Sequence, residues 1–238
     1  MVNKFRDIYD TLKNEINEGL YNDAMVLPTE MALIERFGTS RNTVRRAIQL
    51  LNEDGLVYSV KGRGVVILER IEIDKKSFKV GNFQGLKALS ADTEVEKKTI
   101  VQEFHELTVD DSLAKKISFP VGERVYLVKR LRLIDGKAMM SDTSYFKKSI
   151  VKGLNEKIIA GSIYDHIKQN LDFKIAASKS IMKVESAKDS DFKELALGKN
   201  NCVGILENAV YNDMGKLFEY TTIRYIPNEY ALISFDQN

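Results

Sequence analysis

The segment TSRNTVRRA, residues 39–47, places three arginines and one asparagine within six positions. At about 100° per residue of a helix, Arg41, Asn42, Arg45 and Arg46 fall opposite an apolar stripe. An arginine can donate two hydrogen bonds to guanine O6 and N7, and an asparagine amide can pair with adenine. The segment therefore predicts a helix that reads bases or one that presents an ordinary solvated basic face. Its surroundings must decide between the two.

A second pair of arginines, Arg130 and Arg132, stands two residues apart in the strand-like run RVYLVKRLRLI, so both share one face of a strand. Their planar forks match phosphate oxygens. The helix start at GSIYDH offers free N–H groups and the Ser162 hydroxyl to an anion. Asp142 and Glu219 are acceptors that suit sugar hydroxyls. These groups could bind a phosphate and a polyol. The alternative is that the arginines pair with sheet neighbours at a solvated edge.

Other chemistries have little support in the composition. A single cysteine, Cys202, and two histidines far apart in sequence, His105 and His166, leave little material for a metal site, and we expect no cofactor. We find no Ser/His/Asp order and no P-loop. No apolar run approaches ~18 residues, and the N-terminus has no secretory pattern. The net charge is only +2, so any basic surface must be local.

The elements expected near the N-terminus give the first arginine segment a context. Thr29 and Gly38 suit the start and the end of a short helix, and Ser40 suits the start of the helix that carries the arginines. Two short helices joined by a turn that contains glycine form a helix-turn-helix. The run LVYSV–KGRG–VVIL then predicts a hairpin that carries Lys61 and Arg63. We therefore expect a winged helix-turn-helix that binds DNA.

The segment LPTEMALIERFGTSRNTVRRAIQLLNEDGLVYSVKGRGVVI resembles the DNA-binding domain of the GntR family of bacterial transcription regulators, with close matches at LPTE, SRNTVRRA and GRG. By this resemblance, Thr29 and Glu30 lie near the DNA backbone. Thr43 has two open roles, a groove contact or a packing contact. The full expected DNA-binding set is Thr29, Glu30, Ser40, Arg41, Asn42, Thr43, Arg45, Arg46, Lys61, Gly62, Arg63 and Gly64.

Three segments are expected along the chain: a DNA-binding domain over 1–70, a charged and partly extended linker over 71–79, and a second domain over 80–238. Hairpins are predicted over 124–146, turning at Asp135-Gly136, and over 203–226, turning near Met214-Gly215. Further strands are expected over 99–107 and 174–184, and helices over 109–117, 162–171 and 189–197. These elements favour an α+β domain around an antiparallel sheet.

The motifs KRLRLIDGKAMMSDTSYF, GSIYDHI and GKLFEYTTIRY resemble the UTRA effector domain of the HutC-type GntR branch, whose fold is chorismate-lyase-like. The resemblance implies an effector-binding and dimerisation domain. Asp142 stands where a glutamate is more usual, and Asn82 where a serine is. The length and GNFQGLKAL resemble trehalose-operon repressors, which respond to trehalose 6-phosphate. The implied effector-binding set is Asn82, Arg130, Arg132, Asp142, Ser162, Tyr164, Glu219 and Tyr225.

The favoured hypothesis is a cytoplasmic, homodimeric repressor of a sugar-utilisation operon. It would bind double-stranded operator DNA and be released by a phosphorylated sugar. Another sugar phosphate, such as an amino-sugar phosphate, remains open as the effector. Two other classes are weighed against this: an enzyme that also binds DNA, which lacks an evident catalytic group, and a DNA-binding structural protein without a ligand, which leaves the face with Arg130 and Arg132 unexplained.

Overall fold

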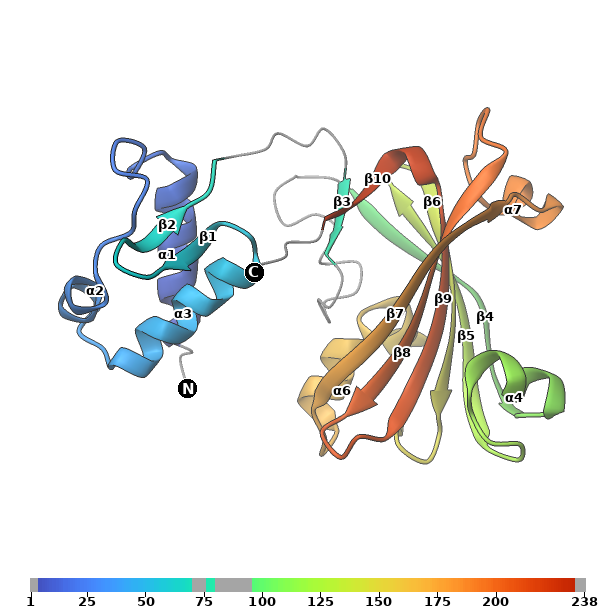
Figure 1. The fold of residues 1–238 in the computed structure, drawn as a ribbon. Coiled ribbons are helices and arrows are strands. Elements are labelled where there is room, and N and C mark those ends of the chain that lie inside the picture. The colour runs from blue at the N-terminus through green and yellow to red at the C-terminus, as the bar shows by residue number, and fades with distance from the viewer. Residues whose placement is uncertain (1–3, 70–75, 80–95, 234–238) are drawn as a thin grey trace. The chain divides into compact units, whose positions relative to one another are not determined.

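The computed structural model describes residues 4–69, 76–79 and 96–233 (Figure 1). The chain forms two compact units, and the division between them falls inside the segment 71–79 that we interpreted as a linker. Each unit has its own hydrophobic core, and each is described by itself below.

The first unit is a three-helix core followed by a small hairpin. Its elements are α1 (Lys4–Asn17), α2 (Glu30–Phe37), α3 (Arg41–Glu53), β1 (Val57–Val60) and β2 (Gly64–Ile67). The strands pair antiparallel, with Val60 opposite Gly64. Leu12 of α1, Leu33 of α2 and Leu51 of α3 are fully buried in one cluster, which holds the helices together. The expected winged helix-turn-helix is confirmed.

The second unit is built on a six-stranded antiparallel sheet with the order β4-β5-β6-β9-β8-β7. Its strands are β4 (Lys97–Thr108), β5 (Arg124–Ile134), β6 (Lys137–Lys147), β7 (Ile175–Ser186), β8 (Cys202–Asn212) and β9 (Leu217–Tyr225). The β5–β6 turn places Asp135 and Gly136 at positive φ, as the Asp-Gly signal predicts. The α+β class and the antiparallel sheet are confirmed.

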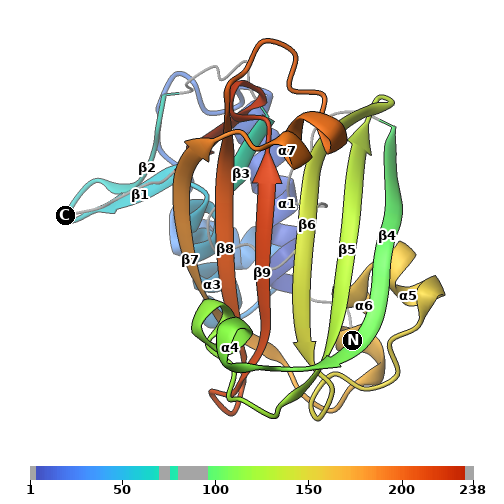
Figure 2. The same ribbon diagram turned by 90° about the vertical axis from the view of Figure 1, so that its right-hand side faces the viewer.

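Helices cover both faces of this sheet (Figure 2). On one face, α5 (Glu156–Ala160) and α6 (Ile163–Asn170) pack on Val128, Phe146 and Val210. On the other face, α4 (Asp111–Ile117) packs on Val125, and α7 (Asp189–Glu194) is tied to the sheet by ion pairs. The sheet therefore carries two separate layers, and the functional residues must be assigned to one of them.

Two features of this unit were not predicted from the sequence. Helix α5 is one short turn capped by Asn155, whose side chain accepts from the Ile158 N–H group. Strands β3 (Lys76–Lys79) and β10 (Tyr230–Ile233) pair in parallel although they lie about 150 residues apart. A short η2 turn (Pro227–Glu229) leads into β10. The expectation that the linker is partly extended agrees with β3.

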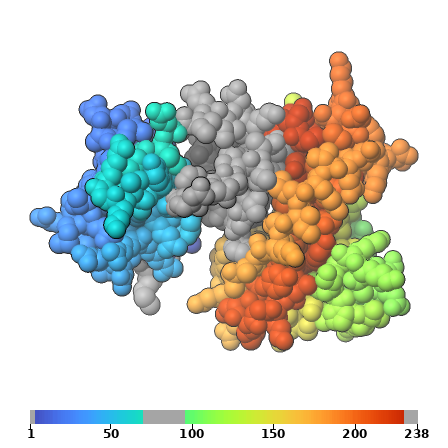
Figure 3. Space-filling view, viewed as in Figure 1, coloured from blue at the N-terminus to red at the C-terminus, as the bar shows by residue number. Residues whose placement is uncertain are grey.

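The edge strand β7 and the helix α7 leave apolar side chains in solvent. In the space-filling view, orange residues of β7 lie at the surface of the second unit (Figure 3). Ile181 and Val184 of that strand are 50% and 66% exposed, and Phe192 of α7 is 53% exposed. None of the helices in the described residues is long and apolar enough to span a membrane.

Candidate functional site

The helix-turn-helix is fixed by local capping. Thr29 accepts a hydrogen bond from the Ala32 N–H group at the start of α2, and Ser40 accepts one from Thr43 at the start of α3. Gly38 ends α2 at φ 53°, a left-handed conformation that glycine adopts at little cost. These caps make the turn short. Thr43 itself is half-buried, and its hydroxyl oxygen lies 2.9 Å from the hydroxyl oxygen of Ser40. A packing contact and a groove contact therefore both remain open for Thr43.

The outward face of α3 carries the predicted base-reading residues. Val44, Ala47, Ile48 and Leu51 are buried, whereas Arg41, Asn42, Arg45 and Arg46 are exposed, as the helical spacing indicates. Arg45 donates from Nε to both carboxylate oxygens of Glu30, at 2.9 and 3.1 Å. The same carboxylate lies 3.7 Å from Nε of Arg41. One acidic side chain therefore lies against two of the three outward arginines, Arg41 and Arg45.

Arg46 has a different contact from the other two arginines. Its guanidinium lies 4.1 Å from the centroid of the Phe5 ring in α1. A cation over an aromatic face is attracted by the ring, and Arg46 thereby also joins α3 to α1. In the wing, Lys61 and Arg63 are exposed, and Gly62 and Gly64 have φ of 83° and 98°. The tight wing turn therefore requires glycine at both positions.

The second unit contains a buried cluster of two arginines and one aspartate. Arg130 and Arg132 lie on β5, and Asp142 lies directly opposite Arg130 on β6. The two Nε groups donate to different oxygens of Asp142, at 2.9 and 2.8 Å. Arg130 Nη1 also donates to the Ile159 carbonyl of α5, and Arg132 Nη1 to the Thr99 hydroxyl of β4. All three charged residues are less than 10% exposed.

This geometry bears on both alternatives for the two arginines. They do pair with a sheet neighbour, Asp142, but on an interior strand rather than at a solvated edge. Each oxygen of Asp142 accepts a hydrogen bond from one arginine, so this carboxylate orients both side chains. Burial, with a contribution from Arg130, lowers the pKa of Arg132, while Asp142 opposes that shift. Two buried cations share one buried anion.

A second acidic residue, Glu219 on β9, lies on the same face of the sheet. Its Oε1 accepts from the Thr221 hydroxyl at 2.7 Å, whereas its Oε2 has no hydrogen-bond partner among the described residues. Burial raises the pKa of Glu219 to about 7, although the hydroxyls of Thr221 and Tyr164 oppose the shift. Burial and the nearby Glu219 carboxylate raise the pKa of Tyr164 well above its ordinary value. A buried carboxyl oxygen without a partner is open to a ligand hydroxyl.

Two of the remaining predicted effector residues, Tyr225 and Ser162, lie on other elements of this unit. Tyr225 lies opposite Gly204 of β8, and a Cβ on Gly204 would come within 2.2 Å of the Tyr225 ring. Glycine at 204 therefore makes room for the ring. Ser162 is half-buried and caps α6 by accepting from the Asp165 N–H group at 3.1 Å. Asn82 lies outside the described residues.

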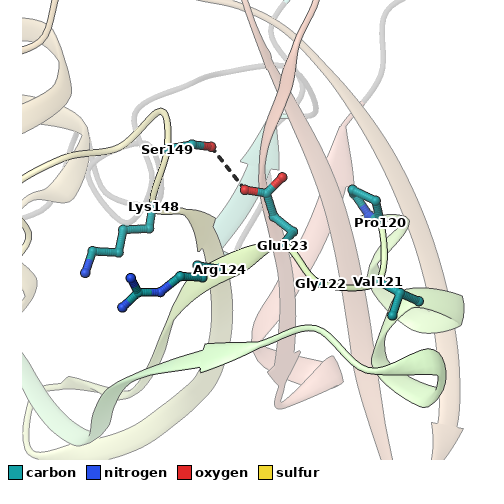
Figure 4. A pocket seen from close by; sticks show the side chains of 7 residues that line it. All are labelled: Pro120, Val121, Gly122, Glu123, Arg124, Lys148 and Ser149. Atoms are coloured by element: carbon teal, nitrogen blue, oxygen red, sulfur yellow. Dashed lines mark hydrogen bonds between the residues drawn. The ribbon is translucent and has the colours of Figure 1, made fainter.

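A shallow pocket lies away from the cluster of Arg130, Arg132 and Asp142, at the turn between α4 and β5 (Figure 4). It is lined by Pro120, Val121, Gly122, Glu123, Arg124, Lys148 and Ser149. Its two cations, Arg124 and Lys148, both pair with Glu106. Both cations are in contact with solvent, which screens their charge, so the pocket lacks the buried positive charge of the Arg130–Arg132–Asp142 cluster. Among the described residues no group of acidic, histidine or cysteine side chains could bind a metal ion.

Two contributors to the buried cluster were missed from the sequence. Thr221 shares the strand face of Glu219, so period two gave a usable signal for it. Thr99 contacts Arg132 only because β4 pairs with β5 in the register that puts these two residues opposite each other. Nothing in the local sequence of Thr99 indicates that register.

Comparisons with known proteins assign both units. The family described as "Bacterial regulatory proteins, gntR family" matches residues 4–67, and the UTRA domain matches residues 94–231. The chain is 30% identical over 234 residues to the HTH-type transcriptional regulator TreR of Bacillus subtilis, covering 98% of this chain and 97% of that one.

Solved structures also resemble this chain. The crystal structure of YydK, a possible transcriptional regulator from Bacillus subtilis, covers the whole of both chains with a TM-score of 0.80 at 23% identity, which supports the fold alone. The effector-binding domain of the B. subtilis trehalose repressor TreR covers 59% of this chain and 98% of its own, with a TM-score of 0.55 and 26% identity.

Proposed function

Because the chain belongs to the gntR family of bacterial regulatory proteins and carries a UTRA domain, we propose that it represses a sugar-utilisation operon and is released from its operator by a phosphorylated sugar. The general class of the protein follows from the family: the chain is a transcriptional regulator and not an enzyme. It has a DNA-binding helix-turn-helix and a domain for a small-molecule effector. The identity of the effector and the direction of the response form the proposal.

The observation that carries the effector class is the excess positive charge of the buried cluster. Among the described residues, Asp142 is the one acidic partner that Arg130 and Arg132 share, and the raised pKa of Glu219 keeps that group largely neutral below about pH 7. Charges are costly to bury unless they are paired, so a second anion is favoured here. Arginine forks bind phosphate through paired, charge-assisted hydrogen bonds. A phosphate ester would supply the missing negative charge.

The neighbouring groups suit the sugar part of such an ester. Oε2 of Glu219 makes no hydrogen bond within the described part of the chain, and the Tyr164 hydroxyl lies near this carboxylate. The Tyr225 ring rests over Gly204 and offers an apolar wall with a polar tip. Ser162 sits at the N-terminus of α6, where free N–H groups and the helix dipole favour an anion. We therefore assign these four residues, with both arginines and Asp142, to the effector site, and we retain Asn82 as a further candidate.

Trehalose 6-phosphate is the first effector to test. The support is the 30% identity to TreR over nearly the full length of both chains and the similarity to the effector domain of the trehalose repressor. An amino-sugar phosphate is the second candidate, since 30% identity leaves room for a change of sugar. The two differ only in the sugar part, so both make the same demand on Arg130 and Arg132.

On the DNA side, we assign the major groove to the outward face of α3 and the DNA backbone or minor groove to the wing. A single winged helix reads only a short site, so we infer a homodimer, formed through the UTRA domain, that binds a near-palindromic operator in the cytoplasm. Sedimentation of residues 79–238 tests this placement. A monomer at high micromolar concentration would refute it.

The test of the whole proposal is release of labelled operator DNA, followed by fluorescence anisotropy, with wild type and Arg130→Ala side by side. Trehalose 6-phosphate should release the wild type and leave the variant bound, and free trehalose should release neither. We expect a coupling of roughly 1–3 kcal/mol between the two ligands. If the two proteins respond identically, the arginines are structural. If only another sugar phosphate releases the wild type, the site stands and trehalose 6-phosphate is wrong.

A further inference from the structure

The carboxylate of Glu30 holds one arginine of α3 in a defined orientation. Arg45 donates from Nε to both oxygens of Glu30, and Glu30 is the first residue of α2. Within the described part of the chain, Nη1 and Nη2 of Arg45 make no hydrogen bond. The Nε edge is therefore occupied, and the two terminal nitrogens remain open, which is the edge that an end-on guanine contact needs.

Glu30 itself is a poor candidate for a phosphate contact. A carboxylate has no donor to offer a phosphate oxygen and repels it by charge. It lies against the groove-facing side of α3 because α2 ends at Gly38 and the turn to α3 is only three residues long. An acidic group in that place weakens general attraction to DNA. Its presence is explained if it contributes to selectivity instead.

We propose that Glu30 is a positioning residue that directs the terminal nitrogens of Arg45 toward the base edges and so sets the preference for guanine at one position of each half-site. The inference rests on the proposed placement of α3 in the major groove. Arg41 is held less tightly, because its Nε lies 3.7 Å from Glu30 and its Nη2 contacts only the Met31 sulfur, also at 3.7 Å. Arg45 is therefore the partner whose orientation depends on Glu30.

The test is selection from a randomised DNA duplex library by the full-length protein, followed by sequencing. Wild type should enrich a motif with a guanine in each half-site. Glu30→Gln should bind random duplex more tightly, because one negative charge is lost, yet the enrichment at that guanine should fall about two- to five-fold, the effect expected from losing an exposed charge pair. Glu35→Gln, on the same helix, is the matched control, and it should change binding to random duplex without changing the motif.

A double-mutant cycle separates positioning from direct contact. In an Arg45→Ala background, Glu30→Gln should have no further effect on the motif. If it still changes one position there, Glu30 acts on a base directly or through Arg41, and the inference is wrong. It is also wrong if Glu30→Gln and Glu35→Gln give the same motif. If the wild type enriches no motif at all, the proposed DNA-binding function fails instead, so the two failures are distinguishable.

Discussion

Two pairs of arginines, Arg41 with Arg45 and Arg130 with Arg132, each share one carboxylate, but they do so in opposite surroundings. On α3, the side chains of Arg41 and Arg45 are 57% and 59% exposed, and their acidic partner is itself in contact with solvent. On β5, the side chains of Arg130 and Arg132 are 9% and 11% exposed and share a buried carboxylate. Exposed pairs exchange partners easily, because water screens the charges. Buried pairs exchange partners less easily, and this is the reason why we propose a charged ligand for the β5 pair.

This contrast explains why one family of regulators can use arginine for both of its ligands. DNA brings many phosphates to an open surface, and the arginines there stay exposed, so that a base edge can reach them. The effector that we propose would bring one phosphate, and the arginines assigned to it are oriented beforehand. Asp142, Thr99 and the Ile159 carbonyl orient the β5 pair from three different elements.

The largest expected effect tests the buried side of the comparison. Asp142→Ala leaves two buried cations without their common partner, and we expect a loss of about 3–5 kcal/mol in the free energy of unfolding, measured by urea denaturation. Glu30→Ala is the corresponding change on α3 and should leave stability nearly unchanged. Equal losses in the two variants would show that burial does not distinguish the two arginine pairs.

A second effect concerns pH. Burial raises the pKa of Glu219 to about 7 in the folded protein, above its ordinary value of 4.5, so the folded state holds a proton that the unfolded state has released between these values. Stability from this group is complete below pH 4.5 and is lost as the pH rises through 7, by up to about 3 kcal/mol. Glu219→Gln should remove this slope from denaturation curves measured between pH 5 and 8. A slope that persists unchanged would contradict the assignment.

A third, smaller effect tests the wall of the effector site. Gly204→Ala should displace the Tyr225 ring, because the new Cβ overlaps it, and we expect a cost of about 1–3 kcal/mol in thermal or urea unfolding. In a Tyr225→Leu background the same change should cost less, since the ring that it meets is gone. A cost that does not depend on Tyr225 would place the effect elsewhere on β8.

The smallest effect concerns the exposed side. Lys61→Ala in the wing should weaken binding to all duplexes about equally and reduce the salt slope of log K by about one, as expected for one phosphate contact. Arg41→Ala should instead weaken the operator more than a random duplex. Anisotropy titrations between 50 and 200 mM salt distinguish the two; a sequence-dependent effect of Lys61→Ala would place the wing on base edges.

Local features could be predicted from the sequence, and long-range ones could not. Three features depend only on residues that are close in sequence: the caps Thr29 and Ser40, the buried stripe of α3, and the turn at Asp135-Gly136. Helix α5 was missed because five residues are too short to show a helical period.

The buried site depends on pairing between distant strands. The hydrophobic pattern places Arg130 and Arg132 on one face of a strand, but it carries no information that helices cover that face. Arginine is rarely buried unless it is paired, so sequence alone favours an exposed position. The partner that makes burial possible, Asp142, reaches Arg130 only through the β5–β6 register. Family resemblance proposed these residues as a group, and the structure supplies their contacts.

The most direct test of the central claim is calorimetric titration of the full-length protein with sugar phosphates and their free sugars: trehalose 6-phosphate, glucosamine 6-phosphate, trehalose and glucosamine. The account predicts that one phosphate ester binds at least about ten-fold more tightly than its free sugar, because charge-assisted hydrogen bonds to Arg130 and Arg132 carry the difference. Arg132→Ala should abolish that preference. A free sugar that binds as tightly as its phosphate ester, or a preference that survives in Arg132→Ala, would contradict it.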